Sequence, residues 1–199
     1  SLIIIILSNK WKLIRAITLL ISMLFIIVIS TTDNKLKERM IDHTISQTNF
    51  FSENYIPDHE LLFKSAYYMF LDSPLYGNGP KMFRKLCDDR RYYLEFEGYN
   101  SCSTHPHNSY FQLLAETGII GTLPIIFLFI IISFKLLQHL IRRIFNSEKI
   151  LTDVQICLFS AIIISLWPLN VNLNFFGNWM NVIYFLPIGI IFSTFKKVN

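Results

Sequence analysis

The feature that most constrains this chain is the length of its uncharged apolar runs. No Lys, Arg, Asp or Glu occurs within residues 16–32, 117–134 or 154–195. A bilayer core requires about 20 apolar residues in one helix, and the third run is far too long for a single crossing of a core about 30 Å thick. Its middle, 167–179, carries Pro, Gly, Asn and Trp residues typical of an interfacial turn. We therefore expect an all-α integral membrane protein, a multi-spanning helical bundle.

The composition supports this class. The chain is 52% hydrophobic and 16% charged, which excludes a disordered chain and disfavours an ordinary soluble domain. Its net charge of +4 reflects the basic residues that flank the apolar runs and gives no reason to expect a nucleic-acid partner. An apolar stretch opens the sequence and is followed, not preceded, by basic residues, so a signal peptide does not fit. We interpret the sequence as a fragment of a longer chain.

Charge predicts the orientation of the spans. Outside the net-acidic segment 33–116, basic residues gather at 10–15, 135–149 and 196–197. The positive-inside rule places these three groups in the cytoplasm and segment 33–116 in the periplasm. The predicted order is the end of a truncated span at 1–8, a span at 11–32, an external loop at 33–117, a span at 118–136, a cytoplasmic loop at 137–152, a span at 153–170, an external turn at 171–177, a span at 178–195 and a cytoplasmic tail at 196–199.

The large external loop is predicted to be mainly helical. Helical periodicity favours one amphipathic helix in 33–56 and another in 59–72, which stops at a Ser-Pro pair. Glycines at 77 and 79 then form a compact turn. A glycine-rich turn can bind phosphate through main-chain amides, but the context of a nucleotide loop is missing here, which favours a plain turn.

Two cysteines, Cys87 and Cys102, lie in the external loop, and Cys157 lies in an apolar run. A disulfide between the first two would close a loop of about 15 residues, worth roughly 3 kcal/mol in the chain-entropy model. Two free thiols are the alternative, because two cysteines alone do not establish a bond.

The most informative segment is 102–121, where His105 and His107 precede Ser109 and Gln112. The Ser–Gln spacing is that of a capping box, so a helix is expected to begin there and lead into the membrane. The histidines could simply be interfacial polar residues. A metal site formed by Cys102 and both histidines lacks an evident fourth ligand, and no metal is predicted.

At these residues the chain resembles the O-antigen ligases and O-antigen polymerases of bacterial envelopes. His107-Asn108 is followed after nine residues by a Gly-x-x-Gly motif at 118–121, and a Pro-Leu-x-Gly-x-Gly-Pro motif stands upstream at 74–80. The family usually has an Arg about fifteen residues before that motif, where this chain has His59. The resemblance covers about 59–135.

The resemblance implies a nucleotide-independent glycosyltransferase of the bacterial inner membrane that needs no cofactor. The donor would be a polyprenyl-diphosphate-linked glycan, and the acceptor would be lipid A core for a ligase or a lipid-linked glycan for a polymerase. We expect the ligase and keep the polymerase as the alternative. A non-enzymatic membrane protein or a transporter portion is a second alternative; it predicts ionisable residues near the bilayer midplane, which the expected spans lack.

The expected site residues follow from this chemistry. His107 is the candidate base or transition-state stabiliser, because imidazole titrates near neutral pH. Asn108 would orient it or the acceptor, Glu116 would fix the imidazole, and His105 is secondary. Arg84 is the first candidate for binding the diphosphate, since Arg suits phosphate oxygens. The weaker candidates are Arg90, Arg91, Lys64 and His59. Acceptor sugars could stack on the loop's aromatic residues, which are otherwise packing residues: Tyr67, Tyr92, Tyr93, Phe96 and Tyr99.

Overall fold

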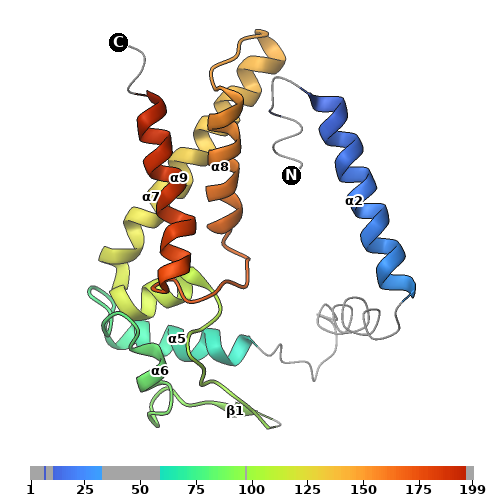
Figure 1. The fold of residues 1–199 in the computed structure, drawn as a ribbon. Helices are drawn as coiled ribbons and strands as arrows, with labels where there is room; N and C mark the ends of the chain where they lie inside the picture. The colour runs from blue at the N-terminus through green and yellow to red at the C-terminus, as the bar shows by residue number, and fades with distance from the viewer. Residues whose placement is uncertain (1–6, 8–10, 33–58, 97, 196–199) are drawn as a thin grey trace. The chain divides into compact units, whose positions relative to one another are not determined.

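The computed structural model describes residues 7, 11–32, 59–96 and 98–195 (Figure 1). The chain divides into two units, Ser1–Pro57 and Asp58–Asn199, and each is described by itself. The helix expected in 33–56 lies outside the described residues, as does most of the span end expected at 1–8.

The first unit contains the apolar helix α2 (Lys12–Thr32), close to the span expected at 11–32. Two of its hydroxyl side chains bond to their own helix: the Thr18 hydroxyl donates to the Ile14 carbonyl at 2.9 Å, and the Ser22 hydroxyl donates to the Thr18 carbonyl at 2.8 Å. Hydroxyls that bond within the helix suit an apolar environment, where an unpaired donor is costly.

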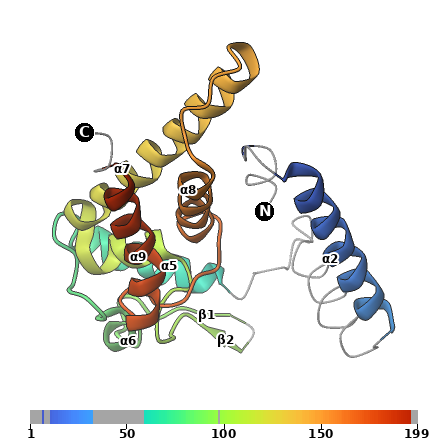
Figure 2. The same ribbon diagram turned by 45° about the horizontal axis from the view of Figure 1, so that its top comes forward.

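As far as the structure describes it, the second unit consists of three packed helices in its C-terminal part and, before them, a region of two helices, two short strands and loops. Its elements are α5 (Glu60–Asp72), α6 (Phe83–Leu86), β1 (Glu95–Phe96), β2 (Tyr99–Asn100), α7 (Ser109–Phe145), α8 (Asp153–Ser165) and α9 (Asn178–Phe195). Helix α8 packs against both α7 and α9, and α5 crosses the first turns of α7 (Figures 1 and 2). The antiparallel pair β1–β2 was not expected in a loop predicted to be mainly helical.

The helix predicted at 59–72 is confirmed as α5. Its buried face, which includes Leu62, Ala66 and Met69, packs with Phe83 and Ala115 in a small apolar core. Helix α5 therefore attaches the region 59–108 to the start of α7, which is where the histidine motif lies.

Helix α7 is long and bent. Gly118 interrupts it with φ 63° and ψ −165°, so that it consists of a short first part and a long apolar second part. Among the described residues, α7 is the helix with the length and composition to cross a membrane, while α8, α9 and the apolar stretch of α2 are shorter.

The helix also continues past the span end expected at 136, through Phe145. The reason is that residues 137–145 contain no Gly or Pro and repeat apolar residues at helical spacing. The following loop folds back onto the helix, since Nδ1 of the buried His139 accepts hydrogen bonds from the main-chain N–H groups of Ile150 and Leu151. Thr152 and Gln155 then form a capping box that starts α8.

Candidate active site around His107

The two sequence motifs of the resemblance interlock in space. The glycine turn lies against the bend of α7: the Asn78 amide donates to the Ala115 carbonyl at 3.0 Å, and the Gly79 amide donates to the Glu116 carbonyl at 2.9 Å. In return, the Ile119 amide donates to the Pro74 carbonyl at 2.8 Å. The motif at 74–80 thus supplies partners for the main-chain groups that the bend in α7 releases.

Glycine is required on both sides of this contact. Gly77 has φ 69° and Gly118 has φ 63°, in the left-handed region that favours glycine. A Cβ on Gly77 would overlap the main chain of Glu116 and Thr117, and a Cβ on Gly118 would overlap the main chain of Leu75. A side chain at either position would therefore push the two motifs apart.

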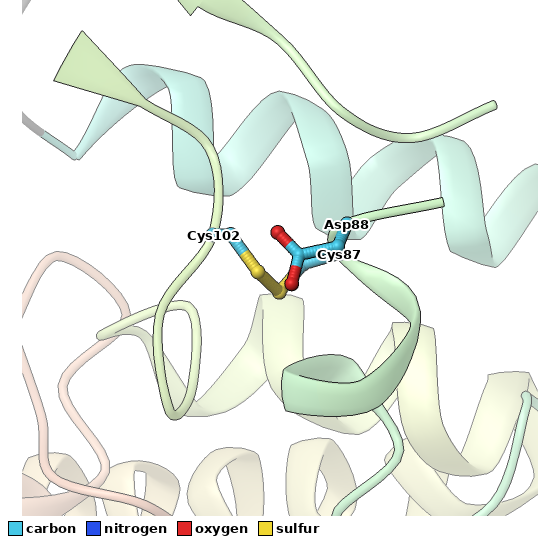
Figure 3. Close-up of side chains that lie close together, drawn as sticks. All are labelled: Cys87, Asp88 and Cys102. Atoms are coloured by element: carbon cyan, nitrogen blue, oxygen red, sulfur yellow. A yellow bond between two sulfur atoms is a disulfide. The ribbon is translucent and has the colours of Figure 1, made fainter. Parts of the chain in front are cut away.

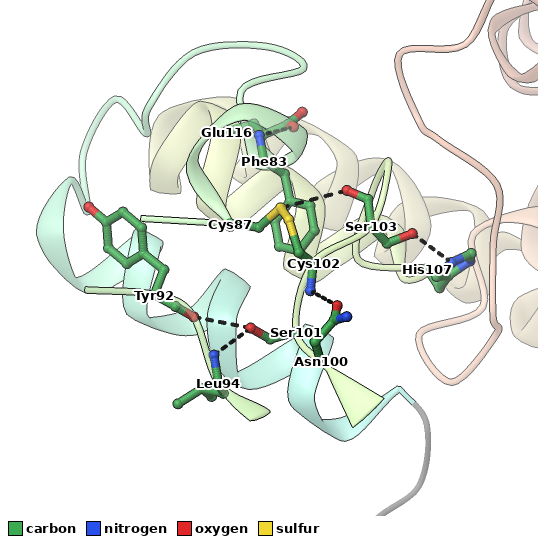
Figure 4. Close-up of a disulfide and its surroundings, with 10 residues drawn as sticks. All are labelled: Phe83, Cys87, Tyr92, Leu94, Asn100, Ser101, Cys102, Ser103, His107 and Glu116. Carbon is green, nitrogen blue, oxygen red and sulfur yellow. Dashed lines mark hydrogen bonds between the residues drawn. A yellow bond between two sulfur atoms is a disulfide. The ribbon is translucent and has the colours of Figure 1, made fainter. Parts of the chain in front are cut away.

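Glu116 was expected to fix the imidazole of His107. In the structure its carboxylate instead stabilises the contact between the two motifs. This buried carboxylate accepts a hydrogen bond from the Phe83 amide at 2.9 Å (Figure 4). It also accepts from the Lys81 amide at 2.9 Å and from the Gln112 side chain at 3.1 Å. The helical rise of about 1.5 Å per residue places it about 12 Å along α7 from the N-cap, which explains the difference.

Asn108 is the N-cap of α7, one residue before the cap expected at Ser109. Its Oδ1 accepts from the amides of Tyr110 at 2.9 Å and Phe111 at 3.2 Å. Its Nδ2 donates to the Pro168 carbonyl at 2.7 Å. Both ends of the side-chain amide are therefore used to start the helix and to hold the α8–α9 loop, which we define as residues 166–177.

His107 lies in a cluster with two other imidazoles. Its ring centroid is 4.2 Å from that of His105 and 5.2 Å from that of His59. Its Nε2 is 3.5 Å from the Ser103 Oγ (Figure 4). Burial lowers the pKa of His107, and electrostatic repulsion between its protonated form and the neighbouring imidazoles of His105 and His59 lowers it further. His107 is therefore a neutral imidazole, able to accept a proton, at neutral pH.

The two neighbouring imidazoles differ from His107. The His105 ring is buried between two partners, with Nε2 3.1 Å from the Asn172 carbonyl oxygen and Nδ1 2.9 Å from the Thr104 Oγ1. Because a carbonyl only accepts, Nε2 carries the proton and Nδ1 accepts from Thr104. Burial lowers the pKa of His105. His59 precedes α5, and its buried Nδ1 has no hydrogen-bond partner in the part of the chain that the structure describes.

The α8–α9 loop contributes to this site, which sequence reasoning missed. The loop was interpreted only as an external turn, yet its Asn172 amide donates to the His107 carbonyl at 2.7 Å. The Phe175 amide donates to the Gln112 side chain at 2.8 Å. The density of Asn residues in 170–178 was the available signal, but nothing in the sequence indicates which segment these residues bind.

A disulfide joins Cys87 to Cys102 (Figures 3 and 4). It borders an open hollow of about 370 Å³. The hollow is lined by Arg84, Asp88, Asn100, Cys102, Ser103 and Thr104. Ser103 lines the hollow and also approaches the His107 ring, so the candidate base and the hollow are neighbours. The metal alternative loses a ligand, because the Cys102 sulfur is bonded to Cys87 and has no thiolate to offer.

The basic residues proposed for the diphosphate are not brought together. Arg84 is exposed at the hollow. Arg91 pairs with Asp89 at 2.9 Å and with Asp72 at 3.5 Å, and the hydrogen bond from Arg91 lowers the pKa of Asp89 to about 2. Lys64 pairs with Glu60 at 2.6 Å on the surface of α5.

The remaining candidates, two for the diphosphate and five aromatic residues for sugar stacking, also lie at different places in the structure. Arg90 is exposed and does not line the hollow, and His59 lies in the imidazole cluster. Of the aromatic residues considered for sugar stacking, Tyr92 is buried and donates to Asp72, so it is a packing residue. The others are exposed: Tyr67, Tyr93, Phe96 and Tyr99.

In the part of the chain that the structure describes, the fold and the site define a mainly helical protein with one helix of membrane length, at whose start an imidazole lies beside a hollow that carries an arginine. The family model for O-antigen ligase matches residues 1–126. The match covers more than half of the chain, so the chain belongs to the O-antigen ligase family, whose members are membrane proteins. It includes both interlocking motifs and ends before the α8–α9 loop. No curated protein and no solved structure matches the chain.

Proposed function

We propose that the chain is part of a membrane glycosyltransferase that transfers a polyprenyl-diphosphate-linked, O-antigen-type glycan to an acceptor sugar at the outer face of the inner membrane. The observation that carries this proposal is the interlocking of the two family motifs, which holds His107 next to the hollow that contains Arg84. The family membership supports a role of the ligase or polymerase type.

The chemistry needs one proton acceptor and one site for an anionic leaving group. The acceptor hydroxyl attacks the anomeric carbon of the donor, and its proton goes to His107. The bond from the anomeric carbon to the diphosphate oxygen breaks, and the polyprenyl diphosphate leaves. An imidazole that is neutral at neutral pH is suited to the first task.

Arg84 is suited to the second task, since its guanidinium can form charge-assisted hydrogen bonds with phosphate oxygens. Arg84 forms no ion pair within 4 Å with another described residue, in contrast to Arg91 and Lys64. A diphosphate in the hollow would lie beside Ser103 and hence beside His107.

The position of the site agrees with a lipid-linked donor. The His107 motif directly precedes α7, the described helix of membrane length, so the anomeric carbon of a lipid-borne glycan would approach it at the membrane surface. In this proposal segment 33–117 faces the periplasm, and residues 10–15 and 137–152 face the cytoplasm, as the positive-inside rule predicts.

The test is a transfer assay in membranes that contain the full-length protein and a lipid-linked glycan, without nucleotide sugar or ion gradient. We expect the donor to be consumed and the glycan to appear on the acceptor. His107→Ala should abolish transfer while the protein still inserts. His105→Ala should reduce transfer less. Full transfer by His107→Ala would refute the catalytic assignment.

The topology has its own test, which is labelling of single-Cys variants with an impermeant thiol reagent. A cysteine at residue 95 should react from the periplasm, and one at residue 146 should react only after the membrane is opened. The reverse pattern would place His107 on the wrong side for a flipped lipid-linked donor.

A further inference from the structure

His107 has an unusual main-chain conformation for a residue with a side chain. Its φ is 58°, in the left-handed region. Residues other than glycine keep such a conformation only where surrounding contacts hold it. The direction of the imidazole depends on this φ, so whatever holds the main chain at 107 also aims the candidate base.

Asn172 provides those contacts from a distant part of the chain. Its main-chain N–H donates to the His107 carbonyl oxygen at 2.7 Å. Its carbonyl oxygen accepts from the His105 Nε2 at 3.1 Å, and its side-chain Nδ2 donates to the Ser109 Oγ at 3.2 Å. One residue thus bonds to His107 and to the residues two places before and after it.

The loop that carries Asn172 is itself held at both ends on α7. The Tyr110 hydroxyl donates to the Leu166 carbonyl at 2.7 Å before Asn172, and the Gln112 side chain accepts from the Phe175 amide at 2.8 Å after it. The main chain around Asn172 is therefore held in place, as is required of a residue that positions a catalytic group.

We propose that Asn172 is a positioning residue for His107, so that the active site is completed by the α8–α9 loop, a segment outside the region matched by the family model. This inference rests on the proposed function. The main-chain N–H of Asn172 fixes the left-handed conformation of His107, and its carbonyl fixes the orientation of the neighbouring His105 ring.

The central test removes the N–H of residue 172 in the full-length protein. Asn172→Pro lacks this donor, whereas Asn172→Ala keeps it and loses only the side-chain contact. Val171→Pro is the matched control. Val171 is exposed, and its N–H donates no main-chain hydrogen bond to another described residue. All variants are compared in the membrane transfer assay at equal amounts of inserted protein.

The expected result separates positioning from folding. Asn172→Pro should lower kcat by about 100-fold with little change in KM for the lipid-linked donor, since a displacement of about 1 Å at a catalytic group costs that much. Asn172→Ala should lower kcat less than Asn172→Pro does, because it keeps the N–H, and Val171→Pro should keep most of the kcat. Equal kcat values in Asn172→Pro and Val171→Pro, or a change confined to KM, would overturn the inference.

A second variant covers the case in which Asn172→Pro fails to insert. Incorporation of the α-hydroxy acid analogue of asparagine at position 172 replaces the N–H by an oxygen and keeps the side chain. The same loss of kcat is expected, and a wild-type kcat would overturn the inference. If the unaltered protein transfers no glycan, the proposed function fails; if His107→Ala transfers glycan, the catalytic assignment of His107 fails; if His107→Ala is inactive and the residue 172 variants are active, the proposed function stands without Asn172.

Discussion

The buried carboxylate of Glu116 accepts a hydrogen bond at 2.9 Å from the main-chain N–H of Phe83, which lies far away along the chain. With the bond from the Lys81 amide, this contact attaches the segment after the glycine turn to the first part of α7. The contact makes the two family motifs a single structural unit.

Glu116→Gln should destabilise the protein. A glutamine has one acceptor oxygen, so its NH₂ group would face one of the N–H donors at Lys81 or Phe83. A buried donor without an acceptor costs about 1–3 kcal/mol. Thermal unfolding of the full-length protein in detergent measures the effect. The matched control is Glu60→Gln at a half-buried position, whose surface pair with Lys64 is worth about 0–1 kcal/mol. Equal melting temperatures for the two variants would contradict the prediction.

The transfer rate should stay high in mildly acidic solution. His107 acts as a base only when it is neutral, and burial together with repulsion from the imidazoles of His105 and His59 lowers its pKa below the ordinary value of 6.5. The rate should therefore fall only when the pH drops below that lowered pKa, so the acid limb of kcat/KM lies below pH 6.5. His59→Gln removes one of the two imidazoles that repel the protonated form of His107 and should move this limb upward. A limb above pH 6.5 in the unaltered protein would contradict the assignment.

Charge reversal on α6 should separate donor binding from general electrostatics. Arg84→Glu places a negative charge in the hollow proposed for the diphosphate, whereas Lys85→Glu makes the same change on the next exposed residue, outside the hollow. A lost charged hydrogen bond is worth about 1.5–3 kcal/mol, so KM for the donor should rise about ten- to hundredfold for Arg84→Glu. Lys85→Glu should change it little. Equal effects of both variants would place the diphosphate elsewhere.

The glycan pattern of a deletion strain should distinguish the proposed ligase from a polymerase. Both reactions break the same donor bond and release the same diphosphate, so the residues around His107 do not discriminate between them. Loss of a ligase should leave long chains on the lipid carrier and bare lipid A core. Single repeats on core would indicate a polymerase, and an unchanged pattern would contradict both.

The elements that could be predicted from the sequence are those whose signals are local. Helix α5 follows from its apolar periodicity and its Ser-Pro end, and α9 coincides with the span expected at 178–195. The span expected at 118–136 covers only part of α7, because a change from apolar to mixed residues marks where a span would end but does not stop a helix.

The candidate site could be predicted only in part, for a related reason. His107 was found because its motif is contiguous in the sequence. The partners of Glu116 and the contact between Asn172 and His107 depend on how distant segments pack, and periodicity does not encode that packing. The same holds for His59, which reaches the imidazole cluster only because α5 crosses the start of α7.

The Cys87–Cys102 bridge also shortens the covalent tether between the proposed cation and the proposed base. Along the chain, the segment from Arg84 to His107 could extend to about 80 Å at about 3.5 Å per residue. Through the bridge, whose Cα atoms are 5.0 Å apart, the tether cannot exceed roughly 33 Å. The segment 88–101 can therefore change its length or sequence, and with it the surface offered to an acceptor, without releasing Arg84 from the neighbourhood of His107.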